Sequence, residues 1–196
     1  MYMPYLKVIE TTQTWTCPKT AEYKIIAVAG GSGGNIYAGG TNYDWYKGSP
    51  GGVTSFGSLL TASGIGPSGG SAGNSYCGGG GGGYTFLDYG GSGGGSNNSP
   101  VKNGGGAAFA YGATLPVGFR SGSPHHTQSG AGYGAGGGGG LGAGGAGGKL
   151  NIAMVTMTQG TQIPCTIGAG GAGAVYPTDG SCGAVGNDGV IVIQEV

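Results

Sequence analysis

The chain has 196 residues, of which 54 are glycine, so glycine is several times more frequent than its usual share of about 7%. Lysine and arginine together number 7, aspartate and glutamate together number 7, and the formal net charge at pH 7 is zero. Nucleic acid is not an expected partner, because phosphate binding needs clustered basic residues, and no apolar run is long enough to predict a membrane span.

Short segments with alternating apolar and polar residues and many β-branched side chains predict β-strands toward both ends of the chain. No segment shows the 3.6-residue period of a helix, and each glycine inside a helix would cost about 1 kcal/mol. The expected fold is therefore mostly β and irregular, without substantial α-helix. In chain order, the predicted strands lie at 5–12, at 15–18 (ended by Pro18), at 22–31, in a pair within 52–64, in two around a TQGTQ turn within 150–171, and at 189–196.

Between these ends, glycine runs alternate with inserts rich in Tyr, Asn, Ser, Pro and Phe. The alternation lacks the fixed period of a solenoid. We therefore expect one glycine-rich domain over 1–196. Its parts 1–30 and 149–196 would form a scaffold of β-strands, and 31–148 would hold the glycine runs and the variable loops.

From Gly136 to Gly148, every third residue is glycine. A three-residue period is that of a polyproline II helix, which has about 3 residues per turn and no internal hydrogen bonds. Without Cβ atoms such helices can pack closely, so that their N–H and C=O groups pair with neighbouring helices. We expect packed polyglycine II helices held by the terminal strands. Glycine-rich loops on a β scaffold and a disordered chain are the alternatives.

The stretches TWTCPKTAEYKIIAVAGGSGG (14–34) and TQGTQIPCTIGAGGAG (158–173) resemble motifs of the glycine-rich domain of phage tail proteins. The first is similar to that domain's T-W-T-V-P motif followed by a strand and a glycine run, and the second is similar to its strand ending in G-A-G-G-A-G. GVTSFGS (52–58) resembles its T-S-F-G element, although here it precedes the G-A-G-G-A-G strand, and GVIVIQEV (189–196) resembles its closing strand.

The middle of the chain resembles, in pattern and composition, the tail-fibre adhesins of T-even-type phages. In that family, glycine-rich motifs form a sandwich of polyglycine II helices, and the loops between them touch the host surface. The resemblance implies a virion protein at the tip of a tail or tail fibre, made in the bacterial cytoplasm. The start of the chain shows no signal peptide, which agrees with that expectation.

The four cysteines do not form a C-x-x-C pattern, so no zinc site is expected. Cys17 and Cys165 occupy positions where the resembled family has valine or a similar core residue, and we expect both to be buried free thiols. Cys77 and Cys182 lie beside glycine runs, and a cytoplasmic protein would keep all four cysteines reduced. Neither a metal nor a cofactor is predicted.

Catalytic residues are not apparent in the sequence. The seven carboxylates are scattered, which disfavours the paired carboxylates of a glycosidase. The segment GVTSFGS is not a G-x-S-x-G nucleophile motif, and no glycine run continues into the GK[ST] of a phosphate-binding loop. We therefore expect a protein without enzymatic activity.

Aromatic residues interleaved with Asn, Ser and Gly remain as candidates for binding, because antibody paratopes use the same residue types. Trp15 and Tyr23 stand in predicted strands and are expected to be structural, as are about half of the other rings. The candidate receptor-binding residues in or beside the inserts are Tyr37, Tyr43, Asp44, Trp45, Tyr46, Tyr84, Phe86, Tyr89, Phe109, Tyr111, Phe119, Arg120, His125, His126 and Tyr176.

The sequence thus predicts an adhesin that binds a bacterial surface protein or glycan and attaches to other tail or fibre proteins. The alternative is a purely structural virion component of the tail, baseplate or capsid. An ice-binding protein is disfavoured, because its flat faces would need short regular repeats, whereas these inserts are long, irregular and aromatic. Self-association into a homo-oligomer is left open.

Overall fold

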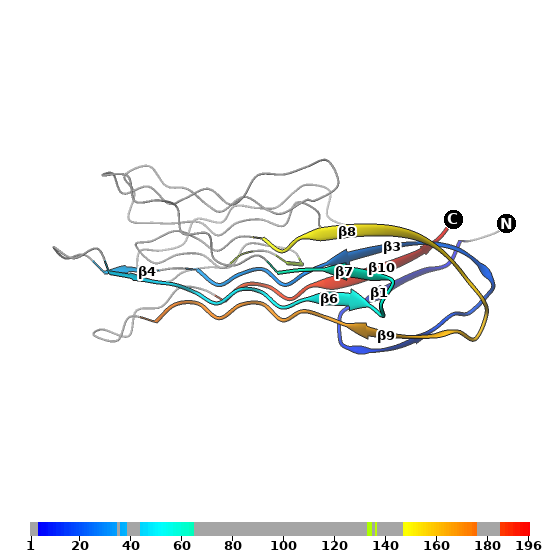
Figure 1. The fold of residues 1–196 in the computed structure, drawn as a ribbon, viewed down its shortest axis with the longest axis horizontal. Coiled ribbons are helices and arrows are strands. Elements are labelled where there is room, and N and C mark those ends of the chain that lie inside the picture. The colour runs from blue at the N-terminus through cyan, green and yellow to red at the C-terminus, as the bar shows by residue number, and fades with distance from the viewer. Residues whose placement is uncertain are drawn as a thin grey trace.

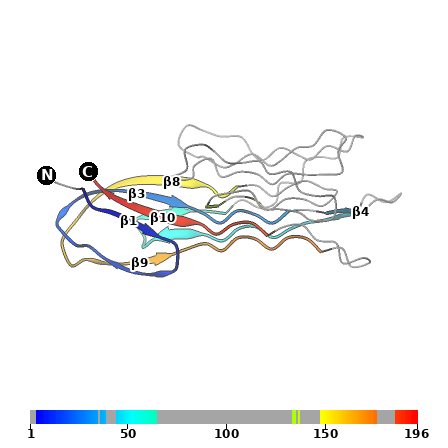
Figure 2. The same ribbon diagram turned by 180° about the vertical axis from the view of Figure 1, so that it is seen from behind.

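The computed structural model describes residues 4–34, 36–38, 44–64, 133–134, 136, 147–175 and 185–196, with the backbone alone for 36–38 and 44–45. These residues form an elongated all-β structure without helices (Figure 1). Both chain ends lie at one end of it, and extended glycine-rich segments run from the strands toward the other (Figures 1 and 2). No helix in the described ranges is long and apolar enough to cross a membrane.

Two antiparallel four-stranded sheets make up the strand end, as the expectation of a mostly β fold requires. Sheet A has the order β1 (Leu6–Ile9), β10 (Val190–Glu195), β3 (Ala21–Val28), β8 (Leu150–Met157). Sheet B has the order β2 (Gln13–Thr16), β9 (Gln162–Thr166), β6 (Thr54–Phe56), β7 (Leu60–Ala62), and β4 (Ile36–Ala38) pairs with β5 (Asp44–Tyr46) as a separate hairpin.

Each strand of the two sheets overlaps a segment predicted from the alternation of side chains, and those predictions are confirmed. The pair expected within 52–64 is the hairpin β6–β7, and the TQGTQ turn joins β8 to β9. Gly160 in that turn has φ 83°, a left-handed conformation that glycine adopts without steric cost.

The main core lies between the sheets. Tyr23, Ile25 and Ala27 alternate along β3 on the side that faces sheet B, and all three are fully buried. The rings of Trp15 and Phe56 from sheet B lie 5.6 Å apart, and Trp15 meets Tyr23 edge to face at 5.7 Å. The prediction that Trp15 and Tyr23 are structural is therefore confirmed.

The outer face of sheet A holds a second apolar cluster. Ile26 and Val28 of β3 pack there with Val190, Val192 and Leu150, while the intervening residues of β3 and β10 face the main core. Both faces of these two central strands are buried, which explains why IIAV and VIVI read as continuous apolar runs rather than as alternating ones.

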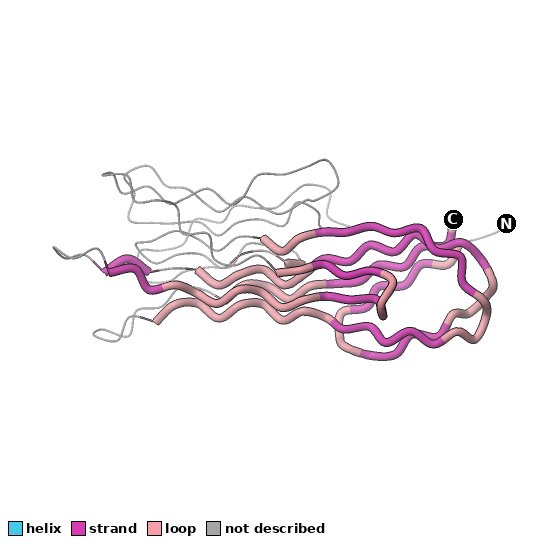
Figure 3. Tube along the Cα trace, viewed as in Figure 1, coloured by secondary structure: helices cyan, strands magenta, loops and turns pink. Residues whose placement is uncertain are grey.

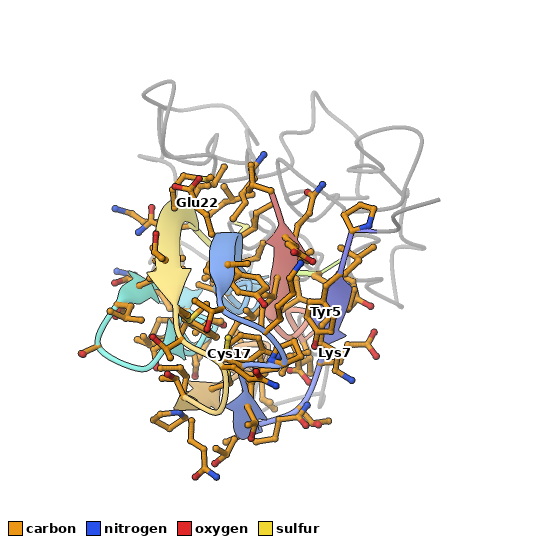
Figure 4. All side chains as sticks on the ribbon, turned by 90° about the vertical axis from the view of Figure 1, so that its right-hand side faces the viewer. Tyr5, Lys7, Cys17 and Glu22 are labelled. Carbon is orange, nitrogen blue, oxygen red and sulfur yellow. The ribbon has the colours of Figure 1, made fainter. Side chains whose placement is uncertain are left out.

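At the end that holds the termini, a buried carboxylate joins the first strand to the last. Glu195 is 7% exposed, and its Oε1 accepts a hydrogen bond from Lys19 Nζ at 2.8 Å. Its Oε2 accepts one from the backbone N–H of Tyr5 at 3.2 Å. The pairing offsets the cost of burying a charge. Lys7 and Glu22 lie on the outside of the same end (Figure 4).

Candidate functional site

Four glycine-rich segments extend the strands of the two sheets away from the chain ends. Segment 29–34 continues β3, segment 47–53 leads into β6, segment 167–175 continues β9, and segment 185–189 leads into β10. They run side by side without regular β pairing (Figure 3). We call these four stretches the glycine-rich segments.

The hydrogen bonds between the glycine-rich segments recur every three residues. Gly30 N donates to Gly52 O at 3.0 Å, and three residues further along Gly33 N donates to Ser49 O at 2.9 Å. A β-ladder repeats every two residues along one side of a strand, so this spacing is not that of a sheet. The same spacing recurs in three other pairings. Between segments 47–53 and 167–175, Gly52 N donates to Ala169 O and Ser49 N donates to Ala172 O. Gly171 N donates to Gly31 O and Ala174 N to Gly34 O, while Gly186 N donates to Gly171 O and Gly189 N to Gly168 O.

Segment 29–34 lies between the other three. Gly31 donates its N–H to Asn187 O at 2.9 Å and accepts at its carbonyl from Gly171 N at 2.8 Å, while Gly30 and Gly33 bond to segment 47–53. Ser32 is completely buried. One extended chain therefore has hydrogen-bonded neighbours on three sides, an arrangement that a flat sheet does not permit.

Glycine recurs in pairs three residues apart where neighbouring backbones approach closely, and Gly52 and Gly170 meet neighbouring backbones as well. A Cβ at any of these positions would come closer than 3.0 Å to a backbone atom of a neighbouring segment or strand, a distance that real Cβ atoms essentially never show. By contrast, the intervening Ser49, Pro50, Ala169 and Asp188 carry exposed side chains. The pairs are Gly30 and Gly33, Gly48 and Gly51, Gly168 and Gly171, and Gly186 and Gly189.

The glycine-rich segments carry the hairpin β4–β5 at the end remote from the chain ends (Figures 1 and 2). Segment 29–34 leads into the hairpin, and segment 47–53 returns from it. In the hairpin, Tyr37 lies directly opposite Trp45, and Ile36 lies opposite Tyr46. Directly opposite residues of an antiparallel pair lie on the same face, so Tyr37 and Trp45 share one face of the hairpin.

Among the predicted binding residues, the structure thus brings together four on this hairpin, Tyr37, Asp44, Trp45 and Tyr46, and the side chain of Tyr46 is half-buried. The other predicted binding residues lie outside the described residues: Tyr43, Tyr84, Phe86, Tyr89, Phe109, Tyr111, Phe119, Arg120, His125, His126 and Tyr176.

Tyr133 is a residue that the sequence analysis did not single out. It packs against the outer apolar cluster of sheet A, and its hydroxyl donates to Glu10 Oε1. That hydrogen bond, with burial, raises the pKa of Tyr133. Together with Asp188, these residues line a hollow of about 410 Å³. In the sequence, Tyr133 could have been noticed as the single large side chain inside the glycine run GAGYGAG. A large ring there supplies the apolar burial that glycine lacks.

The buried cysteines carry no visible chemistry. Cys17 and Cys165 are both buried and free, which confirms that prediction. Burial raises the pKa of the Cys165 thiol, which disfavours the reactive thiolate. Within the described ranges, no group of three or more His, Cys, Asp or Glu side chains could hold a metal ion.

Comparisons with protein-family models, with curated proteins and with solved structures found no match. The resemblance to phage glycine-rich domains stays a prediction based on the residues quoted above.

Proposed function

We propose that this protein is a non-enzymatic adhesin at the tip of a phage tail or tail fibre. Loops carried by glycine-rich helices would bind a bacterial surface protein or glycan, and the opposite end would attach to other tail or fibre proteins of the virion. The observation that carries the proposal is the position of the aromatic hairpin β4–β5, which the glycine-rich segments hold far from both chain ends (Figure 1).

The glycine-rich segments would be packed polyglycine II helices. Hydrogen bonds at three-residue intervals support this proposal, because a helix with about 3 residues per turn presents the same side at every third residue. Glycine pairs three residues apart support it as well, since a Cβ at each of them would come too close to a neighbouring backbone. Such a bundle is a rigid spacer, and a rigid spacer lowers the entropic cost of presenting a binding loop.

The hairpin supplies residue types suited to recognition. Tyr and Trp offer large, rigid surfaces with a polar edge, and the insert NIYAGGTNYDWYKGSP surrounds them with Asn, Gly and Ser. The register pairs Tyr37 directly with Trp45, and two neighbouring aromatic residues would suit a sugar ring or an apolar side chain of a surface protein.

A binding assay on bacterial cells tests this proposal. Purified wild type and a Tyr37→Ser/Trp45→Ser double variant would be mixed with whole cells from a panel of strains, and the bound fraction would be measured. The matched control is Leu6→Ser/Val8→Ser, which alters two exposed apolar residues at the end that holds the chain termini.

We expect the hairpin variant to lose cell binding with an unchanged melting temperature and the control to bind like wild type. Equal loss in both variants, or no binding of wild type to any strain, would leave a structural virion component as the better account.

A further inference from the structure

We infer that the free edge of strand β8 is an interface at which two copies of this chain pair, giving a dimer with a continuous sheet A. The inference is independent of the proposed receptor binding. It rests on the backbone groups, side chains and charges along this edge.

Strand β8 forms one edge of sheet A, and β3 is its only neighbour in that sheet among the described strands. Ala29 N donates to Lys149 O at 2.8 Å, which extends the register in which Val28 pairs with Leu150. In an antiparallel ladder the bonding direction alternates from residue to residue. The N–H and C=O groups of Ile152, Met154 and Thr156 therefore point away from β3.

Side chains along the same edge are apolar and exposed. Ile152 is 47% exposed and Met154 is 50% exposed, and both lie on the outer face of the sheet. The strand has eight residues, LNIAMVTM, without charge or proline. A long, uncharged edge with exposed apolar side chains is a template for pairing with another strand.

The other free edges differ in this respect. Strand β1, at the opposite edge of sheet A, has four residues and carries Lys7, and an edge lysine is a common protection against pairing. Strand β7, at the edge of sheet B below β8, is partly covered, because Asn151 Nδ2 donates to Thr61 O at 2.7 Å. Strand β2, the other edge of sheet B, has four residues, and its exposed side chains Gln13, Thr14 and Thr16 are polar. Among the described strands, the long edge with exposed apolar side chains is therefore the part of β8 from Ile152 to Thr156.

A second copy of β8 fits this edge best. Antiparallel pairing of identical strands about a twofold axis at Met154 places Ile152 opposite Thr156 and Met154 opposite Met154. All outward-pointing backbone groups of the three residues would then find partners. The two Met154 side chains would cover each other and Ile152 would pack against Thr156, because directly opposite residues have Cβ atoms about 5 Å apart. No charge repulsion opposes the pairing, since the strand is neutral.

The test compares two matched lysine variants of the full chain. Met154 and Leu6 are each 50% exposed and belong to the same row across sheet A, one at the β8 edge and the other at the β1 edge. Sedimentation velocity over a concentration series would be measured for wild type, Met154→Lys and Leu6→Lys, with melting temperatures to verify folding. Hydrogen exchange by NMR on wild type would report the amides of residues 151–156.

We expect a wild-type dimer, an unchanged dimer for Leu6→Lys, and dimerisation weakened about a hundredfold for Met154→Lys, because two like charges would lie directly opposite. The amides of Ile152, Met154 and Thr156 should exchange fast in dilute solution and slowly in concentrated solution, while those of the residues between them stay protected throughout.

A wild-type protein that is monomeric at every concentration would overturn the inference, as would a Met154→Lys dimer as tight as wild type. If both variants are monomeric or Met154→Lys does not fold, hydrogen exchange of the β8 amides in wild type tests the inference instead. Concentration-dependent protection at alternate residues of β8 supports the interface, and its absence rejects it.

Discussion

Gly171→Ala is the substitution that most directly tests the packing of the glycine-rich segments. An alanine Cβ at this position would lie 2.8 Å from Gly33 N and 2.8 Å from Pro50 O, and nearer still to Ser49 O. Ordinary contact begins at 3.4 Å, so two neighbouring segments would have to shift. Three hydrogen bonds converge here, Gly171 N to Gly31 O, Gly33 N to Ser49 O, and Gly186 N to Gly171 O.

The magnitude follows from these contacts. Partial weakening of two or three backbone hydrogen bonds, each worth about 1 kcal/mol, costs about 1–2 kcal/mol, and overpacking adds about 1 kcal/mol. Together these costs outweigh the gain of about 0.4–1 kcal/mol from a stiffer unfolded chain. We expect the free energy of unfolding to fall by about 2 kcal/mol, which is a decrease of about 4–8 °C in melting temperature for a chain of this size.

Urea and thermal unfolding followed by circular dichroism would measure the effect, with Ala172→Ser as the control. Ala172 is the next residue along and its side chain is exposed, so the control should change stability by less than about 0.5 kcal/mol. An unchanged or raised melting temperature for Gly171→Ala would refute the reasoning, because that is the result for a glycine in open space.

Three further predictions concern the strand end. Lys19→Met should lower the free energy of unfolding by about 1 kcal/mol relative to the exposed control Lys7→Met, because Glu195 loses its ion-pair partner. The effect is no larger because Lys19 is exposed and solvent screens the ion pair. Equal urea midpoints for the two variants would contradict this prediction. Burial, followed by the hydrogen bond with Cys17, raises the pKa of Tyr23 to about 12, so its contribution to stability should be complete below about pH 10 and be lost as the pH rises toward 12. Measured by urea unfolding between these pH values, the free energy of unfolding should decline less steeply for Tyr23→Phe than for wild type. Equal declines in the two proteins would show that the Tyr23 hydroxyl is not responsible. The Cys165 thiol should react with iodoacetamide only in urea, as measured by peptide mass mapping; labelling of the native protein would contradict its burial.

Strand positions could be predicted well from local pattern, but strand ends less so. We predicted 15–18 for the second strand, whereas β2 covers Gln13–Thr16. Gln13 and Thr14 carry exposed side chains and no apolar signal, yet they pair with Cys165 and Pro164 of β9. Backbone pairing does not depend on side-chain polarity, so the partner strand extends β2 beyond the pattern.

Long-range partners could not be predicted at all. Glu195 bonds to Tyr5 across 190 residues, and Tyr133 bonds to Glu10 across 123. No spacing rule links residues so far apart, because their proximity depends on the order of strands in sheet A. Proximity of Tyr37 and Trp45 could be predicted, since both belong to one insert, but only the register of the hairpin shows that they lie opposite each other.

The sequence by itself determined the strands of the two sheets and the burial of Trp15, because these depend on the local side-chain pattern. It did not predict the hairpin β4–β5, which lies in a segment expected to be a loop, and the glycine recurrence predicted for 136–148 lies mostly outside the described residues. Only the tertiary structure decided which glycines are indispensable. Segments such as GSPG and GNDG resemble ordinary turns in the sequence, yet both line up beside GGSG at 30–33. The reason is physical: a glycine is required where another backbone approaches, and the neighbouring backbones come from distant parts of the chain.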